Sequence, residues 1–232
     1  MRRRLVWLAI VGLAVAPGLY LAWQLALAWT GQPHALGEEP VERLEHETGQ
    51  LAIRMLAATL AISPLRWLGT RPAAARWPRA SAALRAVMPY RRTFGLLTFW
   101  YASAHLATYA VLDLELQLAE VAAEIVKRPY LLVGFAAWLA LVPLALTSTT
   151  GWIRRLGGRR WNVLHRLTYA VAALGLVHFW WSQKKDVSEP LLWTLGFAAL
   201  LGWRVWRRLA RPAAATSSAV ERTTPRTRDA AA

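Results

Sequence analysis

The chain has 232 residues, 56% of them hydrophobic, and a formal net charge of +15 at pH 7. Because it contains no cysteine, it excludes disulfides, zinc–thiolate sites, iron–sulfur clusters and thiol catalysis, and any metal must be held by His, by carboxylate or by a cofactor. A soluble domain this basic would suggest nucleic-acid binding, but the apolar residues come in blocks long enough to cross a bilayer, which indicates an integral membrane protein.

The amino-terminal part of the chain predicts two membrane spans, each followed by a polar loop. The apolar run at 5–29 is longer than a signal-peptide core and lacks a small-x-small cleavage site, so we expect a retained helix. Segment 30–48 is acidic and is interrupted by Pro33, Gly37 and Pro40, which predicts an extramembrane loop without a long helix. A second span is expected at 49–68, and the acid-free, arginine-rich loop at 69–92 suits an anionic membrane surface.

The middle of the chain predicts a third and a fourth span. The third, at 93–112, is rich in aromatic residues, and the fourth runs from 129 to 146. Between them, segment 113–128 has the pattern of a short amphipathic helix outside the bilayer core.

The carboxy-terminal part predicts two more spans and a tail. The fifth span is expected at 159–181 as one helix, and the sixth at about 191–205. Residues 211–232 have the composition of a disordered extension, so we expect a membrane domain at 1–210 and a disordered cytoplasmic tail after it.

Charge predicts the orientation of this six-helix bundle. Thirteen Lys and Arg lie at the amino terminus and in the loops at 69–92 and 151–160, against five in the three opposite loops, whereas all eleven acidic residues of the loops lie on the opposite side. The positive-inside rule therefore places both termini in the cytoplasm and the acidic loops outside. We expect an all-α protein of the bacterial inner membrane, with its acidic loops in the periplasm.

Three histidines lie within expected spans, where such a side chain is expensive and points to function. The third and fifth spans both run outward, and each begins at an arginine pair. At about 1.5 Å per residue, His105 lies roughly 20 Å beyond its pair, His178 roughly 27 Å and His165 about 8 Å. Imidazole is a standard axial ligand of haem iron, and one iron needs two ligands at similar height. His105 and His178 are therefore the predicted pair, with a hydrogen bond between helices as the alternative for each.

Other residues are weaker candidates. His165 lies about 140° from His178 around an ideal helix, so a π-bulge or kink near Gly175 would be needed to align them. We expect His165 to bind a second haem, to contact flavin or quinone, or to make a hydrogen bond near the membrane surface. Arg54 is expected either to snorkel outward or to neutralise a haem propionate. His46, at the outer rim of the second span, is expected to be a solvated loop residue, with contact to a haem edge or a quinone as the alternative.

No hydrolytic or nucleotide-binding motif is present: GxSxG, HExxH, GxGxxG and GxxxxGK[ST] are all absent, and no span holds a carboxylate pair. We therefore predict no catalytic residue and no substrate-reducing site in this chain.

Five segments in matching order carry a family resemblance: RRTFGLLTFWYASAHLATY, KRPYLLVG, PLALTSTT, RRLGGRRWNVLHRLTY and HFWWSQKK. Over about residues 5–208 the chain resembles the MsrQ family, haem-binding membrane subunits that partner a periplasmic molybdenum methionine-sulfoxide reductase. That family is similar in architecture to the ferric-reductase transmembrane domain, a helical bundle that holds b-type haem between histidines. The resemblance implies that His105, His165 and His178 are the family's three motif histidines.

The resemblance also implies a function. The chain would take electrons from quinol, or from a cytoplasmic flavin reductase, and pass them through one or two haem b groups to a periplasmic molybdopterin reductase that repairs oxidised methionine. Ferric reductases and NADPH oxidases carry a large cytoplasmic FAD/NADPH domain, where this chain has a tail of about twenty residues, so reducing power is expected from quinol or a separate protein. Members of the family have been linked to FMN, but no residue here independently indicates a flavin site.

Two alternatives stay open. One is a stand-alone ferric or quinone reductase that delivers electrons to small acceptors, and the other is a haem-handling or haem-sensing protein without electron traffic. In the preferred account, the acidic outer loops at 30–48 and 113–128 are the expected docking surface for the partner, through contacts that salt screens.

Overall fold

The computed structural model describes residues 2–183 and 186–210, and every regular element in them is a helix. The expected disordered tail at 211–232 lies outside the described residues. Two of the elements are single-turn helices, η1 of the 3₁₀ type and η2 of the π type. In chain order the elements are α1 (Arg2–Trp29), α2 (Pro40–Leu68), η1 (Pro72–Arg76), α3 (Pro78–Ala86), α4 (Tyr90–Thr108), η2 (Tyr109–Asp113), α5 (Leu118–Lys127), α6 (Pro129–Leu146), α7 (Thr150–Leu164), α8 (Leu167–Ser182) and α9 (Ser188–Leu209).

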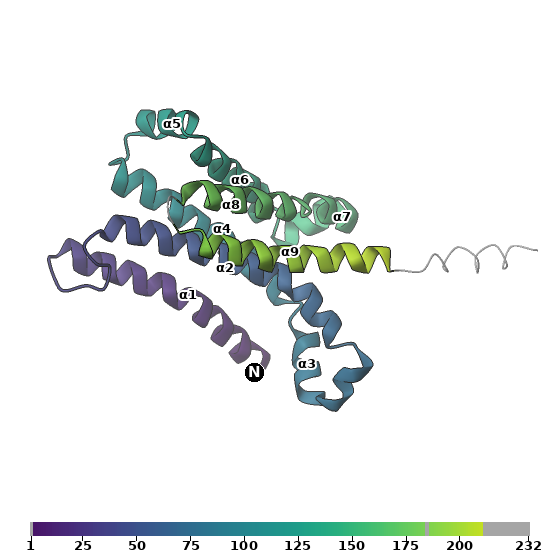
Figure 1. Ribbon diagram of the computed structural model, residues 1–232. Coiled ribbons are helices and arrows are strands. Elements are labelled where there is room, and N and C mark those ends of the chain that lie inside the picture. The colour runs from purple at the N-terminus through teal and green to yellow at the C-terminus, as the bar shows by residue number, and fades with distance from the viewer. Residues whose placement is uncertain (1, 184–185, 211–232) are drawn as a thin grey trace, which may run out of the picture.

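The long helices form a bundle built from two closely packed pairs, α2 with α4 and α6 with α8 (Figure 1). Helix α1 packs against α2 and α4, and α9 packs against α2 and α8. One apolar core joins both pairs to α9; its buried members are Leu56, Leu60, Leu141, Leu144, Val171, Ala172 and Phe197. Since Phe99 and Ala102 of α4 also pack against this core, it holds α4 and α8 as neighbours.

The outward surface of the bundle is apolar, as a lipid environment requires. Leu13 in α1, Trp100 in α4 and Leu192 in α9 are 80%, 67% and 69% exposed. Helices α1, α2 and α6 are each long and apolar enough to cross a membrane, and α7 with α8 makes a fourth candidate if the bent pair is one span. The chain is therefore an all-helical, multi-pass membrane protein with three to four candidate spans.

Most predicted elements have a counterpart in the structure. Helices α1, α2 and α6 occupy the first, second and fourth predicted spans, and α5 lies within the predicted amphipathic segment. Helix α4 with η2, and helix α9, occupy the positions of the third and sixth predicted spans.

Several predictions about helix boundaries were wrong. The loop expected at 151–160 lies within α7, and the loop expected at 69–92 contains the helices η1 and α3. Helix α2 begins at Pro40, so residues 40–48 are helical rather than loop; a proline in the first turn loses no hydrogen bond there. The expected fifth span is two helices, because α7 ends at Leu164, α8 begins at Leu167, and the two are bent by 43°. The break lies at His165, not near Gly175.

Candidate functional site

The imidazole rings of His105 in α4 and His178 in α8 lie side by side where the two helix pairs meet. Their ring centroids are 6.0 Å apart and their planes are inclined at 73°. Both side chains are partly buried. The structure thus brings together the two histidines that their depths in the sequence marked as a pair.

A backbone carbonyl of a neighbouring helix holds each ring. The Nδ1 atom of His105 lies 2.9 Å from the carbonyl oxygen of Glu45 in α2, and that of His178 lies 2.8 Å from the carbonyl oxygen of Tyr130 in α6. Because a carbonyl oxygen only accepts, each Nδ1 carries the hydrogen and donates it. In a neutral imidazole this leaves the Nε2 lone pair of both rings as a metal ligand.

The Thr48 hydroxyl does not compete for this role. It lies 3.5 Å from Nδ1 of His105, but its hydrogen goes to the carbonyl of Leu44 at 2.6 Å. The tautomer of His105 is therefore set by the backbone of α2.

The pair fits an iron porphyrin. Haem iron has four ligands from its macrocycle and takes up to two more from the protein, and imidazole is a usual donor. Within the described residues, no three His, Asp or Glu side chains gather into a metal site of their own. The donor set is two imidazoles, which matches bis-imidazole ligation.

His165 lies apart from the pair, at the break between α7 and α8. Thirteen residues separate it from His178, about 20 Å along a helix. Its ring stacks on Trp161 at a centroid distance of 3.8 Å, and its Nδ1 donates to the Trp161 carbonyl at 3.1 Å. Its Nε2 is 3.4 Å from the hydroxyl of Ser148, which donates to the carbonyl of Leu144 at 2.6 Å. The structure therefore does not join His165 to the other two histidines.

Arg54 also lies away from the pair. Its exposed side chain lines a groove of about 310 Å³ between α1 and α2. The polar residues that share this groove with it are Tyr20, Gln24, Arg43 and Glu47. Arg54 is thus on the side of α2 that faces α1. The hydrogen bond between His105 and the carbonyl of Glu45 is on the side of α2 that faces α4.

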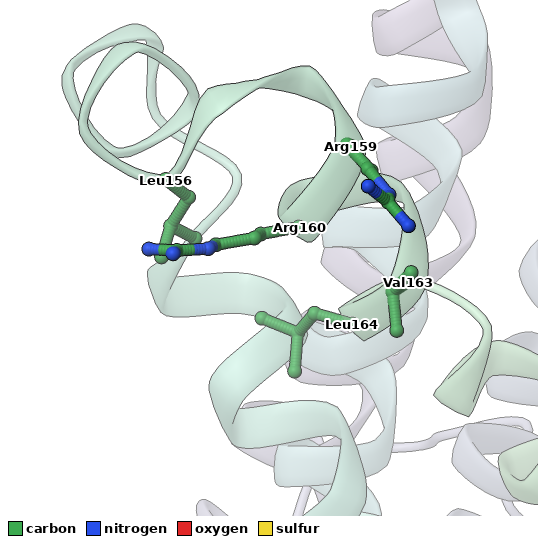
Figure 2. A pocket seen from close by; sticks show the side chains of 5 residues that line it. All are labelled: Leu156, Arg159, Arg160, Val163 and Leu164. Atoms are coloured by element: carbon green, nitrogen blue, oxygen red, sulfur yellow. The ribbon is translucent and has the colours of Figure 1, made fainter.

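A second hollow, of about 520 Å³, is formed by α7 alone and contains none of the three histidines (Figure 2). Its lining is Leu156, Arg159, Arg160, Val163 and Leu164. The two guanidinium groups are the arginine pair that begins the fifth predicted span, so this hollow belongs to the basic side of the bundle.

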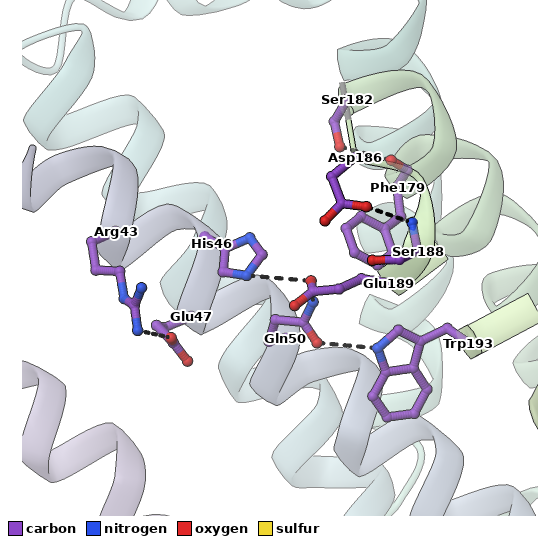
Figure 3. Close-up of polar contacts among 10 residues, drawn as sticks. All are labelled: Arg43, His46, Glu47, Gln50, Phe179, Ser182, Asp186, Ser188, Glu189 and Trp193. Atoms are coloured by element: carbon purple, nitrogen blue, oxygen red, sulfur yellow. Dashed lines mark hydrogen bonds and ion pairs between the residues drawn. The ribbon is translucent and has the colours of Figure 1, made fainter. Parts of the chain in front are cut away.

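A polar network joins the amino-terminal halves of α2 and α9 (Figure 3). Gln50, only 5% exposed, donates from Nε2 to the Glu189 carboxylate at 2.6 Å and accepts from the Trp193 indole at 3.1 Å. Nε2 of His46 lies 3.4 Å from the same carboxylate. His46 lies in α2 with its side chain 36% exposed, so the prediction of a loop residue was wrong, although the side chain does reach solvent.

The sequence reasoning missed the groups that orient the two imidazoles. They are main-chain carbonyls, of Glu45 and Tyr130, and a carbonyl has no side-chain signature. The one signal in the sequence is a glycine four residues after each, at Gly49 and Gly134.

Comparison with known proteins finds relatives over most of the chain. Residues 48–176 match the family model described as "Ferric reductase like transmembrane component". This region contains His105 and His165 and ends two residues before His178. No solved structure matches the chain.

Curated relatives share the name "Protein-methionine-sulfoxide reductase heme-binding subunit MsrQ". The chain is 47% identical to that of Xanthomonas euvesicatoria pv. vesicatoria (strain 85-10), over 92% of both proteins. It is 47% identical to that of Xanthomonas campestris pv. campestris (strain B100), over 94% of both. It is 38% identical to that of Polaromonas naphthalenivorans (strain CJ2), over 83% of this chain and 82% of the relative. The chain therefore belongs to the MsrQ family and carries a ferric-reductase-like transmembrane domain.

Proposed function

We propose that this chain binds haem b between His105 and His178 and relays electrons to a periplasmic, molybdenum-dependent methionine-sulfoxide reductase. The observation that carries the proposal is the pair of imidazoles, whose ring centroids are 6.0 Å apart. Each ring is hydrogen-bonded through Nδ1 to a backbone carbonyl. It is supported by relatives whose names describe a heme-binding subunit of a protein-methionine-sulfoxide reductase.

The proposal includes the placement of the chain in the bacterial inner membrane. Its six spans would be α1, α2, α4 with η2, α6, the bent pair α7–α8, and α9. The excess of Lys and Arg at the amino terminus and in the loops at 69–92 and 151–160 supports cytoplasmic termini. The His105–His178 pair then lies in the outer half of the bilayer, near the acidic loops.

The protein's part in electron transfer would be to hold the haem and to orient its two imidazole ligands. The carbonyls of Glu45 and Tyr130 fix both imidazoles in the Nδ1–H tautomer, so that both Nε2 atoms are ready to ligate. Partial burial of the site together with two imidazole ligands would set the potential of the bound haem. Bound haem would supply a one-electron Fe(III)/Fe(II) couple.

The electrons come from quinol, or from a cytoplasmic flavin reductase. Reduction of one methionine sulfoxide to methionine takes two electrons and two protons and releases one water, and oxidation of one quinol supplies that number of both. A one-electron relay is therefore used twice for each methionine repaired.

His165 and Arg54 stay predictions as cofactor contacts. The proposal gives His165 a second haem, a flavin such as FMN, or a quinone near the cytoplasmic surface, where its ring lies on Trp161. In the proposal Arg54 neutralises a haem propionate, which requires its exposed side chain to leave the groove against α1.

The test is stepwise electron transfer in the purified, haem-loaded protein. Adding a reduced quinol analogue should shift the Soret and α bands, and adding the reductase with methionine sulfoxide should reverse the shift. No shift on quinol would indicate a haem-handling protein. Reversal by a ferric chelate as fast as by the reductase would indicate a stand-alone ferric reductase.

A further inference from the structure

The two ligand histidines are held by the same local arrangement on two different helices. In α2, the carbonyl of Glu45 accepts from His105, and Gly49 follows four residues later. In α6, the carbonyl of Tyr130 accepts from His178, and Gly134 follows four residues later. The arrangement thus occurs once in each helix pair.

The spacing of four has a geometric reason. In an α-helix the carbonyl of residue i accepts the N–H of residue i+4, and a second lone pair on the oxygen stays available. Because Cβ atoms tilt toward the helix amino terminus, a side chain at i+4 covers the turn that begins at residue i. A glycine at i+4 therefore leaves the carbonyl of residue i open to a donor from a neighbouring helix.

At one of the two glycines the histidine ring lies so close that no side chain can be added without a clash. A Cβ atom added to Gly134 would lie 2.6 Å from Nδ1 and 2.8 Å from Cε1 of His178, which is a steric clash. A Cβ added to Gly49 would lie 3.4 Å from the same two atoms of His105, which is ordinary van der Waals contact. The His178 ring must move if residue 134 gains a methyl group, whereas the His105 ring can stay.

We propose that Gly134, and to a lesser degree Gly49, are positioning residues for the haem ligands. By leaving out a side chain, each lets an imidazole reach a main-chain carbonyl, and that hydrogen bond fixes the tautomer and direction of the ligating ring. This inference rests on the proposed function, since the importance of the ring direction comes from the metal at Nε2.

The bond that Gly134 permits also bears on the ligand strength of His178. A histidine that donates its second ring N–H to a carbonyl is a more basic ligand, and loss of such an outer partner typically weakens metal binding by about 10–100-fold. If the His178 ring turns away from Tyr130, the direction of its Nε2 changes with it.

Helix packing gives a different reason for the same glycines, because small residues let membrane helices approach closely. The two explanations differ in what an alanine disturbs. If the glycine serves helix packing, alanine is harmful whether or not residue 178 carries an imidazole. If the glycine positions the ring, alanine is harmful only while the ring is present.

The test compares Gly134→Ala, Gly49→Ala and Gly196→Ala in the full-length protein, loaded with haem in detergent. Gly196 in α9 is the matched control, because a Cβ there meets nothing within 4 Å. For Gly134→Ala we expect haem affinity at least about tenfold weaker, a six-coordinate low-spin spectrum converted to a five-coordinate one, and a shifted midpoint potential. Gly49→Ala should stay within about twofold of wild type with its spectrum kept, given a clash-free approach, and Gly196→Ala should be unchanged.

A second measurement covers the case in which Gly134→Ala folds poorly. The thermal midpoint of the haem-free protein is compared for Gly134→Ala with His178 present and with His178→Ala. Positioning predicts that the alanine lowers the midpoint only when the imidazole is present. An equal decrease in both backgrounds would overturn the inference in favour of helix packing.

The outcomes separate this inference from the proposed function. If His105→Ala and His178→Ala both keep haem with the wild-type spectrum, the proposed function fails, whatever the glycine variants do. If both lose it while Gly134→Ala binds haem with unchanged affinity, spectrum and potential, only the positioning role fails.

Discussion

His105 and His178 lie with their ring centroids 6.0 Å apart, and each donates its Nδ1 hydrogen to the backbone of a further helix. Four helices, α2, α4, α6 and α8, therefore meet at two imidazoles. The distance between the two imidazoles is a property of how the two helix pairs pack, since moving one pair against the other changes it.

The tautomer of the two histidines can be observed without any cofactor. Because both Nδ1 atoms face carbonyl oxygens, we expect ¹⁵N NMR of histidine-labelled, haem-free protein in detergent to show Nδ1-protonated, neutral rings at positions 105 and 178. Assignment uses the single His→Ala variants. A signal from either ring with the hydrogen on Nε2 would contradict the arrangement described for it.

The polar network between α2 and α9 should contribute to stability. Gln50→Leu leaves the Trp193 indole N–H without its acceptor and removes one of the donors near Glu189, at a cost of about 1–3 kcal/mol in the free energy of unfolding. The control is Arg43→Ala, which breaks an exposed pair with Glu47 at 2.9 Å and should cost about 0–1 kcal/mol (Figure 3). Denaturant unfolding in detergent measures both, and equal losses would rule out a special role for the buried amide.

Docking of the reductase should depend on the acidic outer loops. Neutralising Glu38 and Glu39, both exposed before α2, should raise the KM for the reductase several-fold at low salt and flatten its salt dependence, because rim charges act mainly on the association rate. Arg76→Gln in η1, on the predicted cytoplasmic side, should leave the KM unchanged. A KM that ignores both ionic strength and the outer acids would exclude this docking surface.

Acid should loosen helix α5. The Lys127 ammonium, and after it the Arg128 guanidinium, hold the pKa of Glu124 below its usual value of 4.5. A lowered folded-state pKa means that the stabilisation is complete above the usual value and is lost as pH falls through the folded one. Hydrogen exchange of α5 amides, corrected for intrinsic rates, should lose protection only below about pH 4.5. Glu124→Gln should remove this pH dependence, and a loss of protection at neutral pH in wild type would contradict it.

The pairing of His105 with His178 was accessible from the sequence. Both expected spans rise from an arginine pair on the same side, so a rise of about 1.5 Å per residue gives the relative depth of each histidine. Depth along a helix does not require knowledge of neighbours, and for that reason it could be read without a structure.

The break at His165 was not accessible in the same way. The sequence drew attention to Gly175, but the chain turns where the Thr168 amide and hydroxyl both bond to the His165 carbonyl, at 3.3 and 2.9 Å. A threonine hydroxyl that competes for a backbone carbonyl favours a local turn over a continuous helix. Many threonines in helices do not break them, so this choice depends on the packing of Trp161 and Ser148 around the ring.

The backbone carbonyls that accept from the two histidines also could not be predicted from the sequence. Nothing about Glu45 or Tyr130 as residue types indicates that their main chain accepts from a histidine in another helix. Gly49 and Gly134 carry the signal, but it has meaning only once the pairs α2–α4 and α6–α8 are known.

Haem content and the optical spectrum of histidine variants test the central claim most directly. A pyridine haemochrome titration of wild type should find haem, with a six-coordinate spectrum that is lost in His105→Ala, in His178→Ala and in the double variant, and kept in His165→Ala. A colourless wild-type protein after expression with ample haem supply, or a double variant with an unchanged six-coordinate spectrum, would contradict the account.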